Sequence, residues 1–205
     1  MRKIWRLQSF LLSSIFAFLV CTTASNSAEK AGNFKLTGVD GKTYELKAVA
    51  KDAKLILLNF WEVNCKPCQK EMPEIVRLYK TYEPVGLKLL LVSRDTELTI
   101  PRVAPMVASQ KWDFPVLLDP GLKVSQIYNV KFSPVNILIT NKGEILLRLE
   151  GYAPGNIDEL EKKVISVLGL TEEEVKKLKE EYSKTSKSEE PKDSNTQEEK
   201  ASVDG

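Results

Sequence analysis

Two cysteines, Cys65 and Cys68, are separated by only two residues in a chain of 205 residues. They follow a continuous apolar run over 55–61, and the pattern after them is typical of a helix over 66–82. A thiolate is the species that attacks a disulfide. The unpaired N–H groups and the positive dipole end at the first turn of a helix stabilise a thiolate. We therefore expect Cys65 to be an exposed nucleophile and Cys68 a more buried resolving thiol.

The two residues between the cysteines suit the same chemistry. Pro67 fits the first helical turn, where its missing N–H costs nothing. Lys66 places a positive charge next to Cys65 and further favours the thiolate. A redox-active pair is the interpretation that this spacing favours, with the Cys65–Cys68 disulfide as its oxidised form and no other cofactor.

Other roles for the pair are weaker. A purely structural disulfide would close a very short loop, which restricts the unfolded chain little. A zinc site needs about four ligands, but the chain contains no histidine and only one further cysteine, Cys21. We therefore predict no metal site, although a Cu(I) thiolate site stays open because thiolates suit that soft ion.

Composition excludes several further classes. Without histidine, the chain cannot hold a Ser-His-Asp or Cys-His catalytic arrangement or a His-ligated haem. A net charge of +2 gives no electrostatic argument for binding nucleic acid.

Strand and helix patterns alternate around the cysteines. The turn at Asp40 and Gly41 predicts a β-hairpin close to the N-terminus of the domain. Buried strands, helices and a final hairpin follow, and Gly169 is a suitable helix end. The predicted strands are 34–36, 43–46, 55–61, 87–92, 116–118, 135–140 and 144–149, and the predicted helices are 66–82, 98–110, 121–128 and 157–168. This order predicts an α/β domain with a mixed central sheet flanked by helices and an N-terminal β-hairpin extension.

The N-terminal residues have the order of a secretory signal. A basic start is followed by an apolar run over 10–20 and then by small and polar residues, with a cleavage site after Ala24. Residues 1–24 are therefore predicted to be a signal peptide or an N-terminal membrane anchor, with a lipoprotein signal at Cys21 as a further alternative. Cleavage would leave only the Cys65–Cys68 pair in the exported protein, so no odd thiol could mispair.

The rest of the chain divides by composition. Residues 33–169 hold the apolar patterns and are predicted to form the domain. Residues 170–184 are predicted to form a charged, solvated helix with Glu-to-Lys pairs. Residues 185–205 have almost no apolar residue and are predicted to be a disordered tail.

The stretch LLNFWEVNCKPCQKEMPEI over 57–75 resembles the exported thioredoxin-like reductases of the TlpA/ResA group, which are related to the AhpC/TSA and redoxin proteins. The resemblance extends over 34–168 and implies a thioredoxin fold. The positions in register are Asn59, Phe60, Trp61, Cys65, Pro67, Cys68, Glu71 and Pro73.

The resemblance also implies residue roles. Pro134 matches a cis-proline that packs beside the cysteines and, with Ser133, offers backbone to the substrate. Trp61, Lys66 and Pro67 are the other residues implied to contact substrate. Glu71 matches a glutamate that tunes the cysteines or relays protons, and a carboxylate beside Cys68 could accept its proton.

Two residues depart from the pattern of this group. Asn64 stands where a tryptophan is usual, and Glu62 where a small residue is usual. A carboxylate close to Cys65 would oppose the thiolate. Substrate choice and redox potential are therefore not carried over from the resemblance.

The resulting prediction is a thiol–disulfide oxidoreductase, acting as a dithiol reductase of exported protein disulfides. Its expected partners are a disulfide-bearing protein outside the cytoplasm and a membrane thiol electron donor, and its expected place is the periplasm or the outer side of a membrane anchor. In the resembled group a frequent substrate is the haem-binding CxxC of apocytochrome c, which makes cytochrome c maturation a candidate pathway. The direction of exchange depends on potential and not on the motif.

Two alternatives belong to other classes. A peroxiredoxin-like thiol peroxidase resembles a Thr-x-x-Cys pattern, and Glu62 at the threonine position counts against it. A non-enzymatic Cu(I) carrier is the second alternative, and the absence of histidine counts against the copper chaperones of this fold.

Overall fold

The computed structural model describes residues 29–189. The signal predicted over 1–24 and the part of the predicted tail beyond 189 lie outside the described residues. None of the helices within the described range has the length and apolar character needed to span a bilayer.

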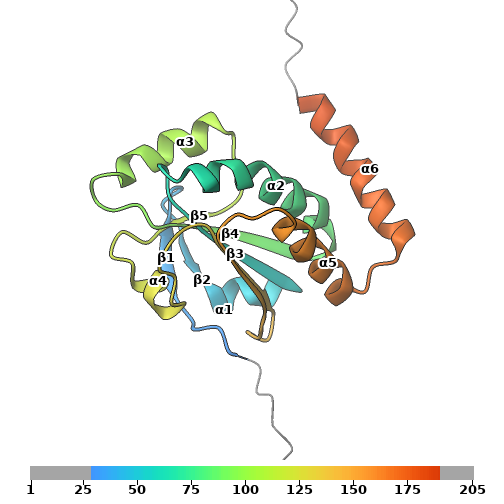
Figure 1. Ribbon diagram of the computed structural model, residues 1–205, viewed down its shortest axis with the longest axis horizontal. Coiled ribbons are helices and arrows are strands. Elements are labelled where there is room, and N and C mark those ends of the chain that lie inside the picture. The colour runs from blue at the N-terminus through green and yellow to red at the C-terminus, as the bar shows by residue number, and fades with distance from the viewer. Residues whose placement is uncertain (1–28, 190–205) are drawn as a thin grey trace, which may run out of the picture.

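A mixed seven-stranded sheet forms the centre of the domain (Figure 1), in the order β2-β1-β5-β4-β3-β6-β7. Strands β3, β4 and β5 run parallel, whereas β6 and β7 continue the sheet antiparallel. The N-terminal hairpin of β1 and β2 joins the other edge by pairing antiparallel with β5. The strands are β1 (Lys35–Gly38), β2 (Thr43–Glu45), β3 (Leu55–Trp61), β4 (Leu87–Ser93), β5 (Val116–Leu118), β6 (Val135–Thr140) and β7 (Ile145–Glu150). The predicted α/β class, mixed sheet and hairpin extension are confirmed.

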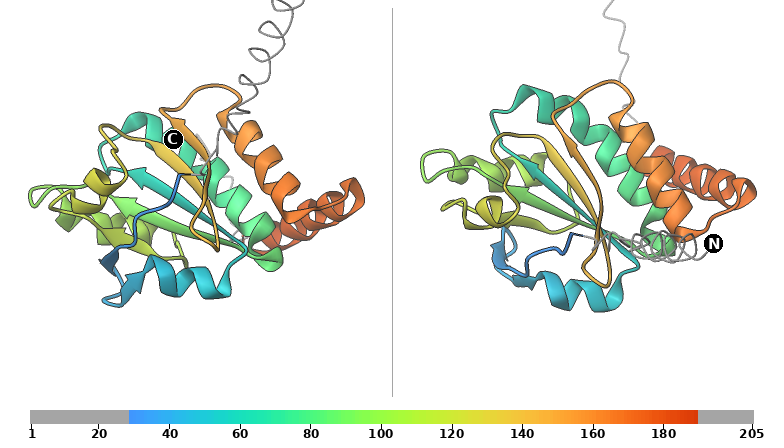
Figure 2. Two further views of the ribbon diagram at one scale, coloured as in Figure 1. Left: turned by 90° about the horizontal axis from the view of Figure 1, so that it is seen from below. Right: turned by 60° about the horizontal axis from the view of Figure 1, so that its bottom comes forward.

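Helices cover both faces of this sheet (Figures 1 and 2). One face carries α2 (Lys66–Tyr82), α3 (Val103–Ser109) and α5 (Asn156–Leu168), and the other carries α1 (Leu46–Val49) and α4 (Lys123–Ile127). Short 3₁₀ turns at Ala50–Asp52, Glu83–Val85 and Ile100–Arg102 complete the connections.

Strand β3 shows why the apolar run before the cysteines is continuous. Successive side chains of a strand point to opposite faces of the sheet. Leu55 and Leu57 accordingly join the core beneath α2 and α5, whereas Ile56 and Leu58 join the core beneath α1 and α4. All seven residues of β3 are buried, so β3 is a rigid base for the turn that carries Cys65.

The helix predicted over 98–110 is shorter in the structure. A 3₁₀ turn at Ile100–Arg102 precedes α3, which begins only at Val103. The residue before a proline is disfavoured in the helical conformation, and proline lacks the N–H that a helix interior needs. Pro101 and Pro105 therefore restrict the regular helix to the end of the predicted range.

The charged C-terminal helix differs more from its prediction. Helix α6 (Glu172–Glu189) passes the predicted boundary at 184, so the first part of the predicted disordered tail is helical. It begins with a capping box, in which Thr171 and Glu174 bond each other's backbone N–H groups. The helix is also not solvated all round, because Leu178 packs against the core and α6 contacts α2.

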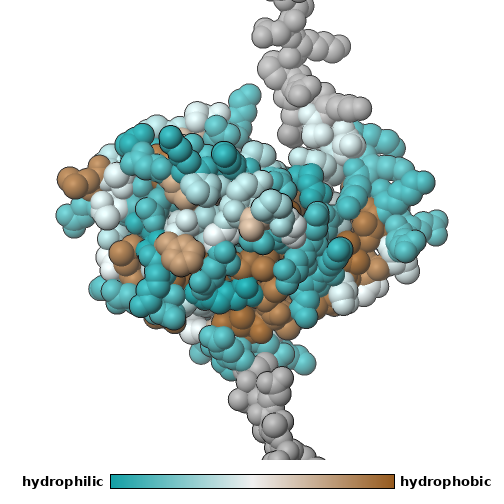
Figure 3. All heavy atoms as spheres, viewed as in Figure 1, coloured by the Kyte–Doolittle hydropathy of each residue, from teal (hydrophilic) through white to brown (hydrophobic). Residues whose placement is uncertain are grey.

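An ion-pair cluster further fixes α6 to the domain. The carboxylate of Glu161 on α5 lies 2.8 Å from the ammonium group of Lys179 on α6. It also accepts hydrogen bonds from Arg77 at 3.0 Å and from Tyr82 at 2.7 Å, both on α2. Figure 3 shows brown, apolar atoms between α6 and the body of the domain. Opposite charge and buried apolar surface thus hold α6 in place.

Candidate active site

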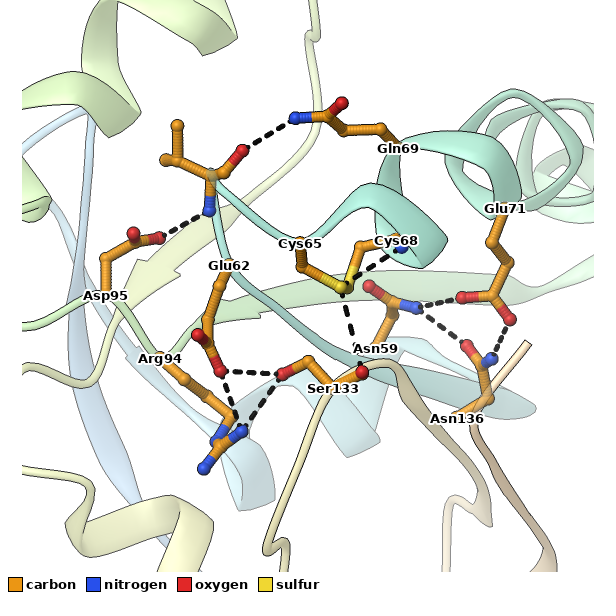
Figure 4. The surroundings of a disulfide bond; sticks show 11 residues. Asn59, Glu62, Cys65, Cys68, Gln69, Glu71, Arg94, Asp95, Ser133 and Asn136 are labelled. Carbon is orange, nitrogen blue, oxygen red and sulfur yellow. Dashed lines mark hydrogen bonds and ion pairs between the residues drawn. A yellow bond between two sulfur atoms is a disulfide. The ribbon is translucent and has the colours of Figure 1, made fainter.

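Cys65 and Cys68 form a disulfide at the start of α2, with the two Cα atoms 5.2 Å apart (Figure 4). Cys65 is the N-cap residue of α2, and its sulfur accepts the backbone N–H of Cys68 at 3.1 Å. The Cys65 side chain is half-buried, whereas Cys68 is only 1% exposed. The expected difference in exposure between the two cysteines is confirmed.

Side chains from two other parts of the chain hydrogen-bond the backbone of the turn between β3 and α2. The Val63 N–H donates to Asp95 Oδ2 at 3.0 Å, and Gln69 Nε2 donates to the Val63 carbonyl at 2.8 Å. The Cys65 N–H donates to the Glu62 carbonyl at 3.1 Å. The sequence reasoning did not identify Asp95 or Gln69, which lie on β4's C-terminal side and on α2. Both hold the backbone that leads to Cys65.

The segment before β6 lies next to this turn. The Ser133–Pro134 peptide bond is cis, as expected. The carbonyl oxygen of Ser133 is 3.7 Å from Cys65 Sγ. The predicted proximity of Pro134's segment to the cysteines is therefore confirmed. Lys66 and Pro67 are exposed on the same turn.

Glu71 is buried, with 1% of its surface exposed. Its carboxyl oxygens accept hydrogen bonds from Asn136 Nδ2 at 2.5 Å and from Asn59 Nδ2 at 3.3 Å. Asn59 also donates to Asn136 Oδ1 at 2.8 Å. Burial raises the pKa of Glu71 to about 7, against the two amide hydrogen bonds that lower it. The pKa of Glu71 therefore lies close to neutral pH.

Figure 4 places Asn59 between the disulfide and Glu71. Glu71 comes three residues after Cys68, which puts the two side chains on one face of α2. Asn136 was not identified from the sequence. A recognisable signal existed, because Asn59 and Asn136 are each the one buried polar side chain of an otherwise apolar strand interior, and the β3–β6 register places them opposite each other.

Trp61 lies beneath the site rather than on its surface. It is 1% exposed and packs edge-on against Trp112, with ring centroids 5.5 Å apart. Its side chain nevertheless lines a groove of about 1270 Å³ that also reaches Cys68, Met72 and, from α6, Tyr182. Trp61 can therefore shape this groove from below.

A second polar cluster, on the other side of Cys65, was also missed. Arg94 follows β4 and is 8% exposed. Its guanidinium lies 2.8 Å from Glu62 Oε1 and 3.0 Å from Ser133 Oγ. A carboxylate of Glu62 lying close to Cys65 would oppose the thiolate, and the structure instead pairs the charge of Glu62 with Arg94. Within residues 29–189, no group of three or more Cys, Asp or Glu side chains is placed to hold a metal ion.

Comparison with known proteins decides the family. The model of the AhpC/TSA family matches residues 28–148, which is more than half of the chain. The chain belongs to the AhpC/TSA family. Within it, the chain is 34% identical over 130 residues to the thiol-disulfide oxidoreductase ResA of Halalkalibacterium halodurans, covering 63% of this chain and 71% of that protein. It is 30% identical over 122 residues to ResA of Bacillus subtilis, covering 59% of this chain and 65% of that protein.

Solved structures agree with this assignment. The candidate thiol:disulfide interchange protein DsbE of Chlorobium tepidum superposes with a TM-score of 0.62 at 26% identity, covering 69% of this chain and 96% of that one. StoA from Bacillus subtilis has the same fold, with a TM-score of 0.54 at 23% identity, covering 65% of this chain and 96% of that one. The resemblance to the TlpA/ResA group and the thioredoxin fold are confirmed, and the AhpC/TSA protein described here is a thiol–disulfide oxidoreductase.

Proposed function

We propose that the protein is a dithiol reductase of disulfides in exported proteins, with Cys65 as the nucleophile and Cys68 as the resolving thiol. The Cys65 thiolate attacks one sulfur of the substrate disulfide, and the other substrate sulfur leaves as a thiolate that takes up a proton. Cys68 then loses its proton and attacks the Cys65 sulfur. The second substrate thiol is released, and two electrons have passed from the protein to the substrate.

One observation carries this assignment of roles. The backbone N–H of Cys68 points at Cys65 Sγ from the first turn of α2. The helix dipole and this donor favour negative charge on Cys65 sulfur. Cys68 is buried, whereas Cys65 is partly exposed, and Cys68 lies one turn further into the helix.

Glu71 supplies a destination for the proton of Cys68. A general base works best when its pKa is close to the working pH, and the pKa of Glu71 is about 7. The carboxylate is buried and accepts hydrogen bonds from Asn59 and Asn136. Proton transfer would run from Cys68 toward Glu71, directly or through an intervening group.

The substrate chain is proposed to bind where backbone and surface groups meet Cys65. Ser133 and cis Pro134 supply backbone beside the sulfur, and Lys66 and Pro67 form the exposed rim. Trp61 contributes from beneath as part of the groove. No cofactor beyond the redox-active disulfide is needed for this reaction, and nucleic acid is not a proposed partner.

The site of action is proposed to lie outside the cytoplasm. The basic and apolar N-terminal sequence supports export, with residues 1–24 as a cleaved signal, a membrane anchor or a lipoprotein signal. The protein would be periplasmic or anchored with its domain facing outward, and a membrane thiol donor would restore its dithiol form. The haem-binding CxxC of an apocytochrome c is the candidate substrate class.

The reduction potential of the Cys65–Cys68 pair tests the direction of transfer. The purified domain is equilibrated in thiol–disulfide buffers of known potential, free thiols are alkylated, and the two forms are counted by mass spectrometry. A reductase is expected to lie below about −220 mV, near thioredoxin at about −270 mV. A potential above about −150 mV, close to the oxidant DsbA, would overturn the reductase assignment.

A further inference from the structure

Arg94 is a buried cation with four hydrogen-bond partners from three parts of the chain. One terminal nitrogen contacts Glu62 Oε1 at 2.8 Å and Ser133 Oγ at 3.0 Å. Nε donates to Ser125 Oγ at 3.3 Å, and the other terminal nitrogen donates to the Lys131 carbonyl at 3.3 Å. Ser133 Oγ also donates to Glu62 Oε1 at 3.1 Å. Burying a charge is costly unless it is paired and hydrogen-bonded, and Arg94 meets this condition.

Glu62 and Ser133, two of the residues that bond Arg94, also contact Cys65 through their backbone. The carbonyl of Glu62 accepts the Cys65 N–H at 3.1 Å, and the carbonyl of Ser133 lies 3.7 Å from Cys65 Sγ. The side chains of the same two residues turn the other way, toward Arg94 (Figure 4). Arg94 thus links the two backbone segments that border the nucleophile.

The backbone N–H of Arg94 donates to the Trp61 carbonyl at 2.9 Å, and the next residue, Asp95, holds the turn through the Val63 N–H. The planar guanidinium can bond several partners at fixed angles. The segment before β6 has no regular structure of its own between α4 and β6. Its position at Cys65 therefore depends on such bonds.

We propose that Arg94 is a positioning residue for disulfide exchange. Through Glu62 and Ser133 it holds the backbone at Ser133 against Cys65, and so fixes where a substrate chain lies when its disulfide is attacked. This inference rests on the proposed function of the Cys65–Cys68 pair. It assigns no contact between Arg94 and the substrate.

Arg94→Lys tests the geometry at constant charge. Lysine keeps a positive charge but cannot reproduce the guanidinium's set of bonds. We expect KM for a cystine-containing peptide to rise about tenfold, the effect of losing about one charge-assisted hydrogen bond. The kcat and the rate at which iodoacetamide alkylates reduced Cys65 should stay within about twofold of wild type, because both depend on the thiolate rather than on docking.

Two further variants make the result specific. Arg77→Lys changes a partly buried arginine in the C-terminal half of α2, where it pairs with Glu161 of α5 and is far along the helix from Cys65, so it should leave KM unchanged. Ser133→Ala removes only the hydroxyl between Arg94 and Glu62, so it tests the linkage even if Arg94→Lys does not fold. Its rise in KM should not add to that of Arg94→Lys, because both remove one linkage.

Folded Arg94→Lys and Ser133→Ala proteins with KM within about twofold of wild type would overturn the inference. An equal rise in Arg77→Lys would do the same, because it would reveal a general loss of stability. Failure of the proposed function would give a different result. Wild type would then reduce the peptide no faster than Cys65→Ser does, and the positioning role of Arg94 would fail together with the proposed function.

Discussion

Replacing Glu71 by glutamine should change how the stability of the protein depends on pH. The folded protein holds the pKa of this carboxyl at about 7, mainly by burial, whereas an unfolded chain returns it to 4.5. The folded state therefore binds the proton more tightly, and stability is lost as pH rises from about 4.5 to about 7. Each pKa unit is worth about 1.4 kcal/mol, so the loss reaches about 3 kcal/mol.

The assay is urea unfolding of the oxidised protein at several pH values from 4.5 to 8.5, followed by tryptophan fluorescence. Glutamine cannot ionise, so Glu71→Gln does not share this loss. The unfolding free energy of Glu71→Gln minus that of wild type should therefore increase by about 3 kcal/mol as pH rises across this range. The constant part of the difference is not predicted, because glutamine offers one acceptor where Asn59 and Asn136 now meet two oxygens. The change with pH is the diagnostic quantity.

Glu97→Gln provides the control for the loss of one negative charge, and it should leave the pH dependence of stability unchanged. Glu97 is exposed in the turn that follows β4, and it is not among the groups that shift the pKa of Glu71. The reasoning would be refuted if the unfolding free energies of wild type and Glu71→Gln differed by a constant amount from pH 4.5 to 8.5. In that case Glu71 would be ionised throughout, and its role as proton acceptor near neutral pH would fail.

Two further substitutions test the hydrogen bonds around buried carboxylates. Asn136→Ala removes an amide that lowers the pKa of Glu71, so that pKa should rise above about 7, which NMR titration of the side-chain carboxyl carbon would measure; an unchanged or lower pKa would contradict this. The pKa of Glu161 is shifted in the opposite direction to that of Glu71. Burial works to raise it, but hydrogen bonds from Arg77, Lys179 and Tyr82 lower it to about 2. Glu161→Gln should therefore lower the free energy of unfolding by up to about 3 kcal/mol at pH 7 and by progressively less toward pH 2. Urea unfolding at several acidic pH values measures this, and a loss of stability that does not decrease with falling pH would disprove the ion-pair account.

Local patterns in the sequence were sufficient for the elements that carry the cysteines. The apolar run and the Cys-Lys-Pro-Cys motif predicted β3 and α2 with their observed ends, Leu55–Trp61 and Lys66–Tyr82. These elements depend on burial and on the chemistry of a helix start, both of which leave a local signature. The cis bond at Pro134 was predicted only through the family resemblance.

Contacts between distant segments were not predictable in the same way. A glutamate six residues past a cysteine is ordinarily solvated, and only the pairing of β3 with β6 places Asn136 over Glu71. The role of Arg94 likewise depends on Glu62 and Ser133, which come from two other segments. For α6, the abundance of charge concealed a stripe formed by Val175, Leu178 and Tyr182, at spacings that share one helical face.

Trapping of a substrate by single-cysteine variants tests the central claim most directly. Reduced Cys68→Ser and Cys65→Ser proteins are incubated with a disulfide-bearing peptide near neutral pH, and intact masses are measured. Cys68→Ser should accumulate as a mixed disulfide through Cys65, because nothing remains to resolve it, whereas Cys65→Ser should trap little or no peptide. Accumulation on Cys65→Ser but not on Cys68→Ser would contradict the assignment of Cys65 as the nucleophile.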